Sequence, residues 1–109
     1  MKRRLRKKFH LGEFREFGFA VQFALDPQLP EAAAGAFLDR FIVQAVEADR
    51  MCAGGGGHGA RWDFFVSSAA RRGSVDEAQR ARVLDWLGRQ PEVLERSAGP
   101  LVDAWHDLL

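Results

Sequence analysis

The segment from Phe17 to Leu25 alternates large apolar side chains with small or polar ones. The apolar positions are Phe17, Phe19, Val21, Phe23 and Leu25. Because side chains in a strand point alternately to opposite faces, this pattern predicts a strand with one buried face. Pro27 and Pro30 follow, and proline cannot donate to a sheet ladder, so the strand ends near Asp26. The chain therefore needs a sheet and a covering layer.

The clearest predicted helix covers residues 30–48. Pro30 suits a first helical turn, and Glu31 complements the positive end of the helix dipole. The apolar stripe at helical spacing is Ala34, Phe37, Leu38, Phe41, Ile42, Ala45 and Val46. This stripe is typical of a helix that covers one face of a sheet.

A second helix is predicted from Ser74 to about Arg89. Ser74 is the expected N-cap, with Glu77 as its capping-box partner, and Pro91 stops the helix. Its predicted inner face is Val75, Ala78, Val83, Leu84 and Leu87, with Trp86 near the edge.

The other predicted elements are shorter. Residues 50–53 read weakly as a strand, and the glycine-rich run 54–59 reads as a flexible connection. Residues 60–69 form a good strand, in which Trp62, Phe64 and Val66 alternate with Arg61, Asp63, Phe65 and Ser67. Residues 71–73 read as a turn. Residues 93–95 and 101–105 are extended candidates around a Gly99-Pro100 break. Leu11, Phe14 and Phe17 indicate a short helical turn that stops at Gly18.

This order predicts an α+β fold of the ferredoxin-like type, with the plan β-α-β-β-α-β. An antiparallel sheet would carry two helices on one face. A chain of 109 residues is long enough for one domain. We expect that domain to span residues 9–109, with a disordered basic arm over residues 1–8 before it. The arm and the short helical turn would both precede the β-α-β-β-α-β core.

The arm holds six of the chain's sixteen basic residues and no acidic one. The other ten basic residues face all fifteen acidic ones, so the chain is an acidic body with a basic end. The basic residues of the arm are Lys2, Arg3, Arg4, Arg6, Lys7 and Lys8. Such a segment neutralises nucleic-acid phosphates or serves as a solubilising tail. Leu5 adds an apolar point that a solubilising tail does not need.

The arm and the first strand carry a family resemblance. The run Arg3-Arg4-Leu5-Arg6-Lys7-Lys8, then Phe9-His10-Leu11, then Glu13-Phe14-Arg15-Glu16-Phe17-Gly18-Phe19, resembles the opening of the YggL family. Members of this family are small bacterial proteins described as binding the large (50S) ribosomal subunit. Gly12, where members often carry an acidic residue, and the four consecutive glycines depart from the family pattern.

The resemblance implies non-catalytic docking on the 50S subunit, with subunit assembly or maturation as the expected stage. The six basic residues of the arm would contact rRNA, and ribosomal protein is a further expected partner. His10 and Phe65 are candidate partner contacts. Phe65 is chosen because it is the best candidate for an exposed aromatic side chain. We expect a cytoplasmic monomer.

Two alternatives remain open at this stage. A ferredoxin-like interaction or ligand-sensing module, dimeric through its sheet, would also use Phe65 and an exposed sheet face. An RNA recognition motif has the same element order, but its third strand needs a basic-glycine-aromatic string, and Asp63 interrupts the aromatic residues here. We therefore expect Phe17, Phe19 and Phe23 to form core.

The sequence contains no motif that indicates an enzyme. We expect no catalytic residues, no metal site, no cofactor, no small-molecule substrate and no membrane segment. The single cysteine, Cys52, excludes an internal disulfide and reads as a small buried hydrophobe. The glycine run lacks the lysine and Ser/Thr of a phosphate loop, and no metal-ligand spacing links the three histidines.

Overall fold

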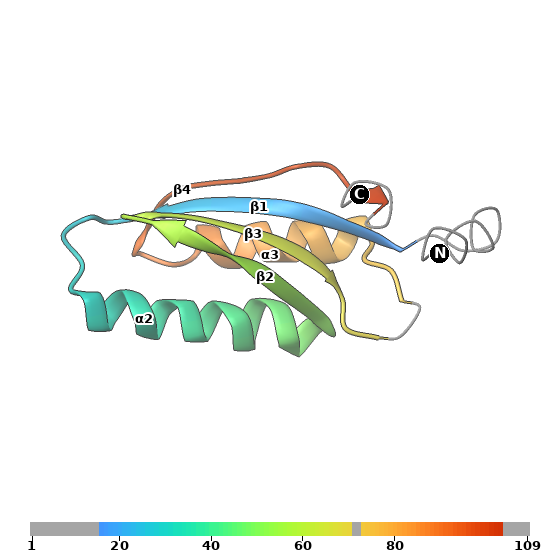
Figure 1. The fold of residues 1–109 in the computed structure, drawn as a ribbon, viewed down its shortest axis with the longest axis horizontal. Helices are drawn as coiled ribbons and strands as arrows, with labels where there is room; N and C mark the ends of the chain where they lie inside the picture. Colours follow the sequence, from blue (N-terminus) through green and yellow to red (C-terminus); the bar gives the residue numbers. More distant parts are fainter. Residues whose placement is uncertain (1–15, 71–72, 104–109) are drawn as a thin grey trace, which may run out of the picture.

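The computed structural model describes residues 16–70 and 73–103, and Figure 1 shows its layers. Within these ranges the strands are β1 (Phe17–Leu25), β2 (Met51–His58), β3 (Arg61–Ser68), β4 (Val93–Ala98) and β5 (Val102–Asp103). The helices are α2 (Glu31–Arg40) and α3 (Glu77–Gly88). A π-helical segment, η1 (Phe41–Val46), and a 3-10 turn, η2 (Glu47–Asp49), continue α2.

The strands form one antiparallel sheet in the order β2-β3-β1-β4, and β5 pairs with the start of β1. Figure 1 shows α2 and α3 on the same side of the sheet. The predicted mixture of an antiparallel sheet with two helices is therefore confirmed. The first strand, the aromatic strand β3 and the two helices all lie close to their predicted positions.

The core lies between β1 and the helices. Phe19, Val21 and Phe23 are at most 2% exposed, as the alternation predicts. Phe17, also predicted to form core, is only half-buried, because it lies at the end of the strand. The Phe23 ring lies 5.7 Å from the Phe37 ring and 5.2 Å from the Phe41 ring, measured between centroids. Each buried phenylalanine contributes about 1.5–3 kcal/mol of apolar transfer free energy, so this cluster fixes the helix layer against β1.

The helix predicted over residues 30–48 is confirmed as one continuous helical segment from Glu31 to Asp49, in three hydrogen-bonding patterns. It ends at Arg50, which adopts a left-handed conformation with φ of 64°. Its buried residues are Phe37, Phe41, Ala45 and Val46, all of which belong to the predicted stripe.

The prediction of a flexible connection over residues 54–59 was wrong. The four glycines belong to β2, and they pair with β3 from Gly54↔Phe65 to Gly57↔Trp62. Only Gly59 and Ala60 form the turn, and Gly59 has a φ of 65°, which glycine adopts without strain. A hairpin partner therefore overrides the low strand propensity of glycine.

The predicted start of the second helix was also wrong. The N-cap is Asp76, whose Oδ1 accepts a hydrogen bond from the Gln79 amide at 2.8 Å, and Gln79 closes the capping box. Ser74 has a different partner, because its Oγ accepts the Phe17 amide at 2.9 Å. Ala78 is exposed rather than inward-facing, and Trp86 is buried rather than marginal.

Several predictions fall on other parts of the chain. The following lie outside the described residues: the arm, His10, Leu11, Phe14, most of the turn at residues 71–73, and the end of the last extended candidate. The predicted helical turn does not extend to its expected end, because Phe17 and Gly18 are the first two residues of β1.

Candidate functional site

The start of β1 is where the chain leaves the basic segment and enters the fold. The six basic residues of the arm, Lys2, Arg3, Arg4, Arg6, Lys7 and Lys8, lie outside the described ranges, as does His10. The strand after them is held firmly. The Val75 amide donates to the Phe17 carbonyl at 3.1 Å, and Phe17 also pairs with Asp103 of β5. The start of the central strand is therefore fixed on both sides.

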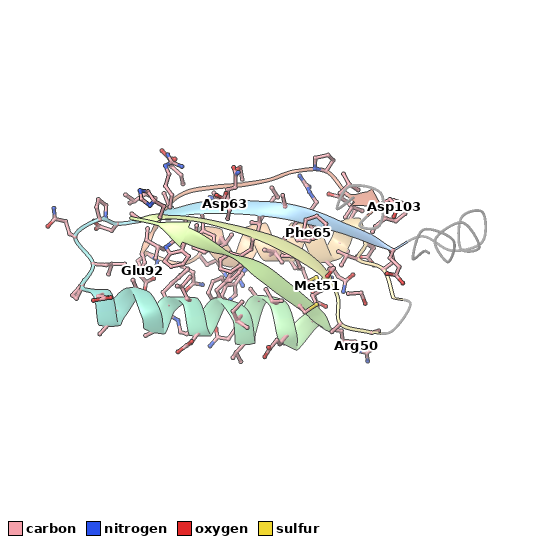
Figure 2. The ribbon with its side chains drawn as sticks, in the orientation of Figure 1. Arg50, Met51, Asp63, Phe65, Glu92 and Asp103 are labelled. Atoms are coloured by element: carbon pink, nitrogen blue, oxygen red, sulfur yellow. The ribbon has the colours of Figure 1, made fainter. Side chains whose placement is uncertain are left out.

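The sheet face opposite the helices is open among the described residues and carries Phe65. Figure 2 shows Asp63 and Phe65 on the side of the sheet away from α2. The Phe65 ring lies against Gly18, where an added Cβ would be 2.7 Å from Cε2 of the ring. Phe65 is thus half-buried, and only part of the ring is available to a partner.

Charged groups share this open face. The Arg61 guanidinium lies 3.1 Å from the Glu95 carboxylate, and both side chains are about two-thirds exposed. Asp63 stands between them and Phe65 along β3. The face therefore lacks the row of exposed aromatic rings with which an RNA recognition motif stacks bases.

The described body is acidic. Thirteen acidic residues and seven arginines lie in the described ranges. Four of those arginines form ion pairs, which are Arg40–Glu92, Arg61–Glu95, Arg80–Glu77 and Arg82–Asp49. The other three are Arg50, Arg89 and Arg96. An acidic body repels phosphates, so the described residues attract RNA less strongly than the basic sequence of the arm does.

Two of the ion pairs are structural. The Arg40 guanidinium contacts the Glu92 carboxylate at 2.9 Å and ties α2 to the turn before β4. The pKa of Glu92 lies below its usual range, chiefly because backbone hydrogen bonding favours the carboxylate, with a further contribution from Arg40. The hydrogen bond from Arg82 to Asp49 raises the pKa of Arg82 and joins α3 to η2.

A cavity of about 590 Å³ opens at the far end of β1. We call it the Trp62 pocket, and its main lining residues are Leu25, Asp26, Leu29, Glu31, Leu38 and Trp62. It lies between the start of α2 and the turn of the β2–β3 hairpin. Sequence reasoning missed it, although a tryptophan on the buried face of a strand, one residue from the hairpin turn, was a usable signal.

Among the residues that the structure describes, no group of three or more His, Cys, Asp or Glu side chains is placed to hold a metal ion. Cys52 is exposed, which corrects the prediction of a buried thiol, and its Sγ lies 3.5 Å from the Ser67 hydroxyl. No helix within residues 16–70 and 73–103 is long and apolar enough to cross a membrane.

The fold is that of a small mixed α/β protein with one sheet and one helix layer, and its acidic body follows a basic segment in the sequence. Sequence comparison gives the particular family. The chain belongs to the YggL 50S ribosome-binding protein family, whose model matches residues 3–106. The match includes the basic block from residue 3 onward.

A protein of Haemophilus influenzae (strain ATCC 51907 / DSM 11121 / KW20 / Rd) is 33% identical over 106 residues. The alignment covers 94% of this chain and 87% of that relative, which is described as an uncharacterized protein. No solved structure matches the chain.

Proposed function

We propose that this protein binds the 50S ribosomal subunit through its basic arm, without catalysis. The observation that carries the proposal is family membership over residues 3–106, since the family is described as 50S ribosome-binding. Ribosome binding implies a cytoplasmic protein. We further propose subunit assembly or maturation as the stage of action, because a small docking protein without a catalytic site acts by occupying a surface.

The charge distribution supports assigning the rRNA contact to the arm. The described body carries thirteen acidic residues against seven arginines, so phosphate binding there is opposed. The arm has six basic groups and no acidic one. Arginine adds bidentate phosphate contacts and stacking on bases. If all six groups engaged phosphates, the log–log salt slope would be roughly −4 to −5.

The remaining contacts are proposed from position. Phe65 offers a partly exposed ring on the open sheet face, and His10 follows the basic block. Both would contact the subunit after the arm has docked. We propose a monomer, because a dimer through the open face would have to bury Asp63 and the exposed Arg61–Glu95 pair.

We also propose that the fold is ferredoxin-like. The element order β1-α2-β2-β3-α3-β4 and the sheet order β2-β3-β1-β4 support this assignment. The fifth strand, β5, and the π-helical continuation of α2 would be additions to the common plan.

The test is co-sedimentation with purified 30S and 50S subunits over a salt series. One variant removes three arm arginines (Arg3, Arg4 and Arg6→Ala). Its matched control removes three body arginines (Arg50→Gly, Arg89→Ala and Arg96→Ala), none of which has an ion pair within the described ranges. We expect the arm variant to lose affinity for 50S and to reduce the salt slope by about 2–3, while the control keeps both.

Extending the arm variant with Lys7 and Lys8→Ala should abolish binding and leave the circular dichroism spectrum unchanged. Retained 50S binding by this five-residue variant would overturn the residue assignment. Equal binding to 30S and 50S that vanishes at physiological salt would overturn the function, because the arm would then act only as a generic polycation.

A further inference from the structure

Trp62 is the aromatic residue that lines the Trp62 pocket, and it belongs to a row of stacked rings behind it. Trp62 stacks on Phe64 with centroids 6.4 Å apart and an angle of 11° between the rings, and Phe64 stacks on Phe23. Gly57, paired with Trp62 across the hairpin, leaves room for the indole, because a Cβ there would lie 2.3 Å from ring atoms. The indole is therefore held between the glycine strand and the aromatic row, and it remains partly exposed at the pocket.

The walls of the pocket are apolar and its charged groups are acidic. Leu29 and Leu38 contribute apolar, half-buried walls. Asp26 and Glu31 are the charged lining residues, and no basic side chain lines the pocket among the described residues. The nearest arginine in sequence, Arg61, is on the open face of β3, where it pairs with Glu95.

The start of α2 also faces this region, and its dipole is worth about half a positive charge. Two carboxylates outweigh that charge, so the pocket is net negative. Neither carboxylate forms an ion pair within the described residues. Asp26 Oδ1 accepts only the Gln28 amide, at 2.9 Å. The pocket thus combines an aromatic face, an apolar channel and two available carboxylates.

We propose that the Trp62 pocket binds the arginine side chain of an extended basic peptide from a partner protein. The arginine stem would lie along the leucine walls, the guanidinium would stack on the Trp62 indole, and Asp26 and Glu31 would pair with it. The chain already uses this chemistry internally, since the Arg40 guanidinium lies 5.3 Å from the Phe37 ring centroid.

The Trp62 pocket lies at the opposite end of β1 from residue 17. Along β1, residue 17 and Leu25 are about 26 Å apart, since a strand rises about 3.3 Å per residue. In the sequence the arm precedes residue 17, which begins that strand, and the pocket lies at the other end of the strand. The protein would therefore have two contact surfaces of opposite charge, one for phosphates and one for a basic peptide. The pocket proposal does not depend on ribosome binding.

The test is an NMR titration of the full chain, following the Trp62 indole N–H. The probe is a blocked pentapeptide, Gly-Leu-Arg-Leu-Gly, and its control is the same peptide with citrulline, which keeps the shape of arginine and removes the charge. We expect saturable shifts at Trp62 with the arginine peptide and at least fivefold weaker binding of the citrulline peptide. Equal binding of the two peptides would overturn the proposal without any variant being made.

A pair of double variants tests whether Asp26 and Glu31 are the carboxylates that bind the peptide. Asp26→Asn with Glu31→Gln should weaken arginine-peptide binding about fivefold to tenfold, because it removes both carboxylates and keeps their shape. The matched control is Asp39→Asn with Glu47→Gln, which removes two exposed acids from the same helical segment. An equal loss in the control would refute the site, since the effect would then be a general change in net charge.

The arm itself is the rival occupant, because it is basic and belongs to the same chain. In the full chain with Arg3, Arg4, Arg6, Lys7 and Lys8 changed to alanine, the peptide should bind as it does to the unmodified chain. Binding seen only after these changes would show that the pocket holds the arm, and would overturn the assignment to a partner peptide.

Discussion

Replacing Gly57 with alanine should destabilise the protein, whereas the same change at Gly56 should not. An alanine Cβ at position 57 would lie 2.3 Å from two atoms of the Trp62 ring. Carbon atoms pack at about 3.5–4.0 Å, so the indole would have to move by more than an ångström. Phe64 stacks against that ring and limits the movement. At Gly56 the added Cβ meets nothing within 4 Å.

The expected magnitudes follow from these contacts. Overpacking of this kind costs about 1–3 kcal/mol of unfolding free energy. A change of 1 kcal/mol moves the Tm of a domain this size by about 4–8 °C, so Gly57→Ala should lower the Tm by about 4–24 °C. Gly56→Ala should leave the Tm unchanged or raise it by a few degrees, because alanine restricts the unfolded chain.

Thermal unfolding followed by far-UV circular dichroism measures both variants. A Tm for Gly57→Ala equal to that for Gly56→Ala would refute the reasoning, because residues 54–57 would then behave as the flexible connection predicted from sequence rather than as a paired strand. Near-UV circular dichroism adds a second reading, since Gly57→Ala should change the environment of Trp62 and Gly56→Ala should not.

The other predictions concern the core, the helix cap and the acid response. Phe23→Ala should cost about 3–5 kcal/mol in urea unfolding, because the ring is 2% exposed and contacts Phe37 and Phe41; a loss below 1 kcal/mol would contradict the packing. Asp76→Ala should cost about 1 kcal/mol in the same assay, because Asp76 is the N-cap of α3. Ser74 is not the N-cap, so Ser74→Ala should not reduce the helix signal as loss of a cap does. A loss of helix signal in Ser74→Ala but not in Asp76→Ala would restore the N-cap predicted from sequence. Glu92 has a lowered pKa in the folded state, so the stability it contributes is present above about pH 5 and is lost as the pH falls through the folded-state pKa. The stability difference between the native chain and Glu92→Gln should therefore shrink on acidification, and a difference independent of pH would count against the Arg40–Glu92 interaction.

Much of the fold could be predicted because local patterns and tertiary packing agree. In β1 the period-two alternation places Phe19, Val21 and Phe23 toward the helices, and the structure buries them there. The helical stripe from residue 34 to 46 likewise faces the sheet through Phe37 and Phe41. Burying these rings contributes a large apolar transfer free energy, so competing local preferences do not change where the rings lie.

The errors arose where tertiary partners decide between local options. Glycine has low strand propensity, and the run is a strand because all four glycines pair with β3, from Gly54↔Phe65 to Gly57↔Trp62. Ser74 and Asp76 are both good N-cap residues. The Ser74 hydroxyl accepts a hydrogen bond from the Phe17 amide instead of capping the helix. The shape of the Trp62 pocket was missed because it forms only where the end of β1, the start of α2 and a hairpin turn meet, and Trp62 was the one local signal for it.

The central claim is that the basic arm contacts rRNA on the 50S subunit. Photo-cross-linking from the arm tests it most directly, with Leu5 replaced by a photoreactive phenylalanine analogue so that all six basic residues are kept. We predict cross-links to rRNA of the 50S subunit, lost when excess unmodified protein competes, and none above background with 30S. Cross-links confined to ribosomal proteins, or equal cross-linking to both subunits, would contradict the account.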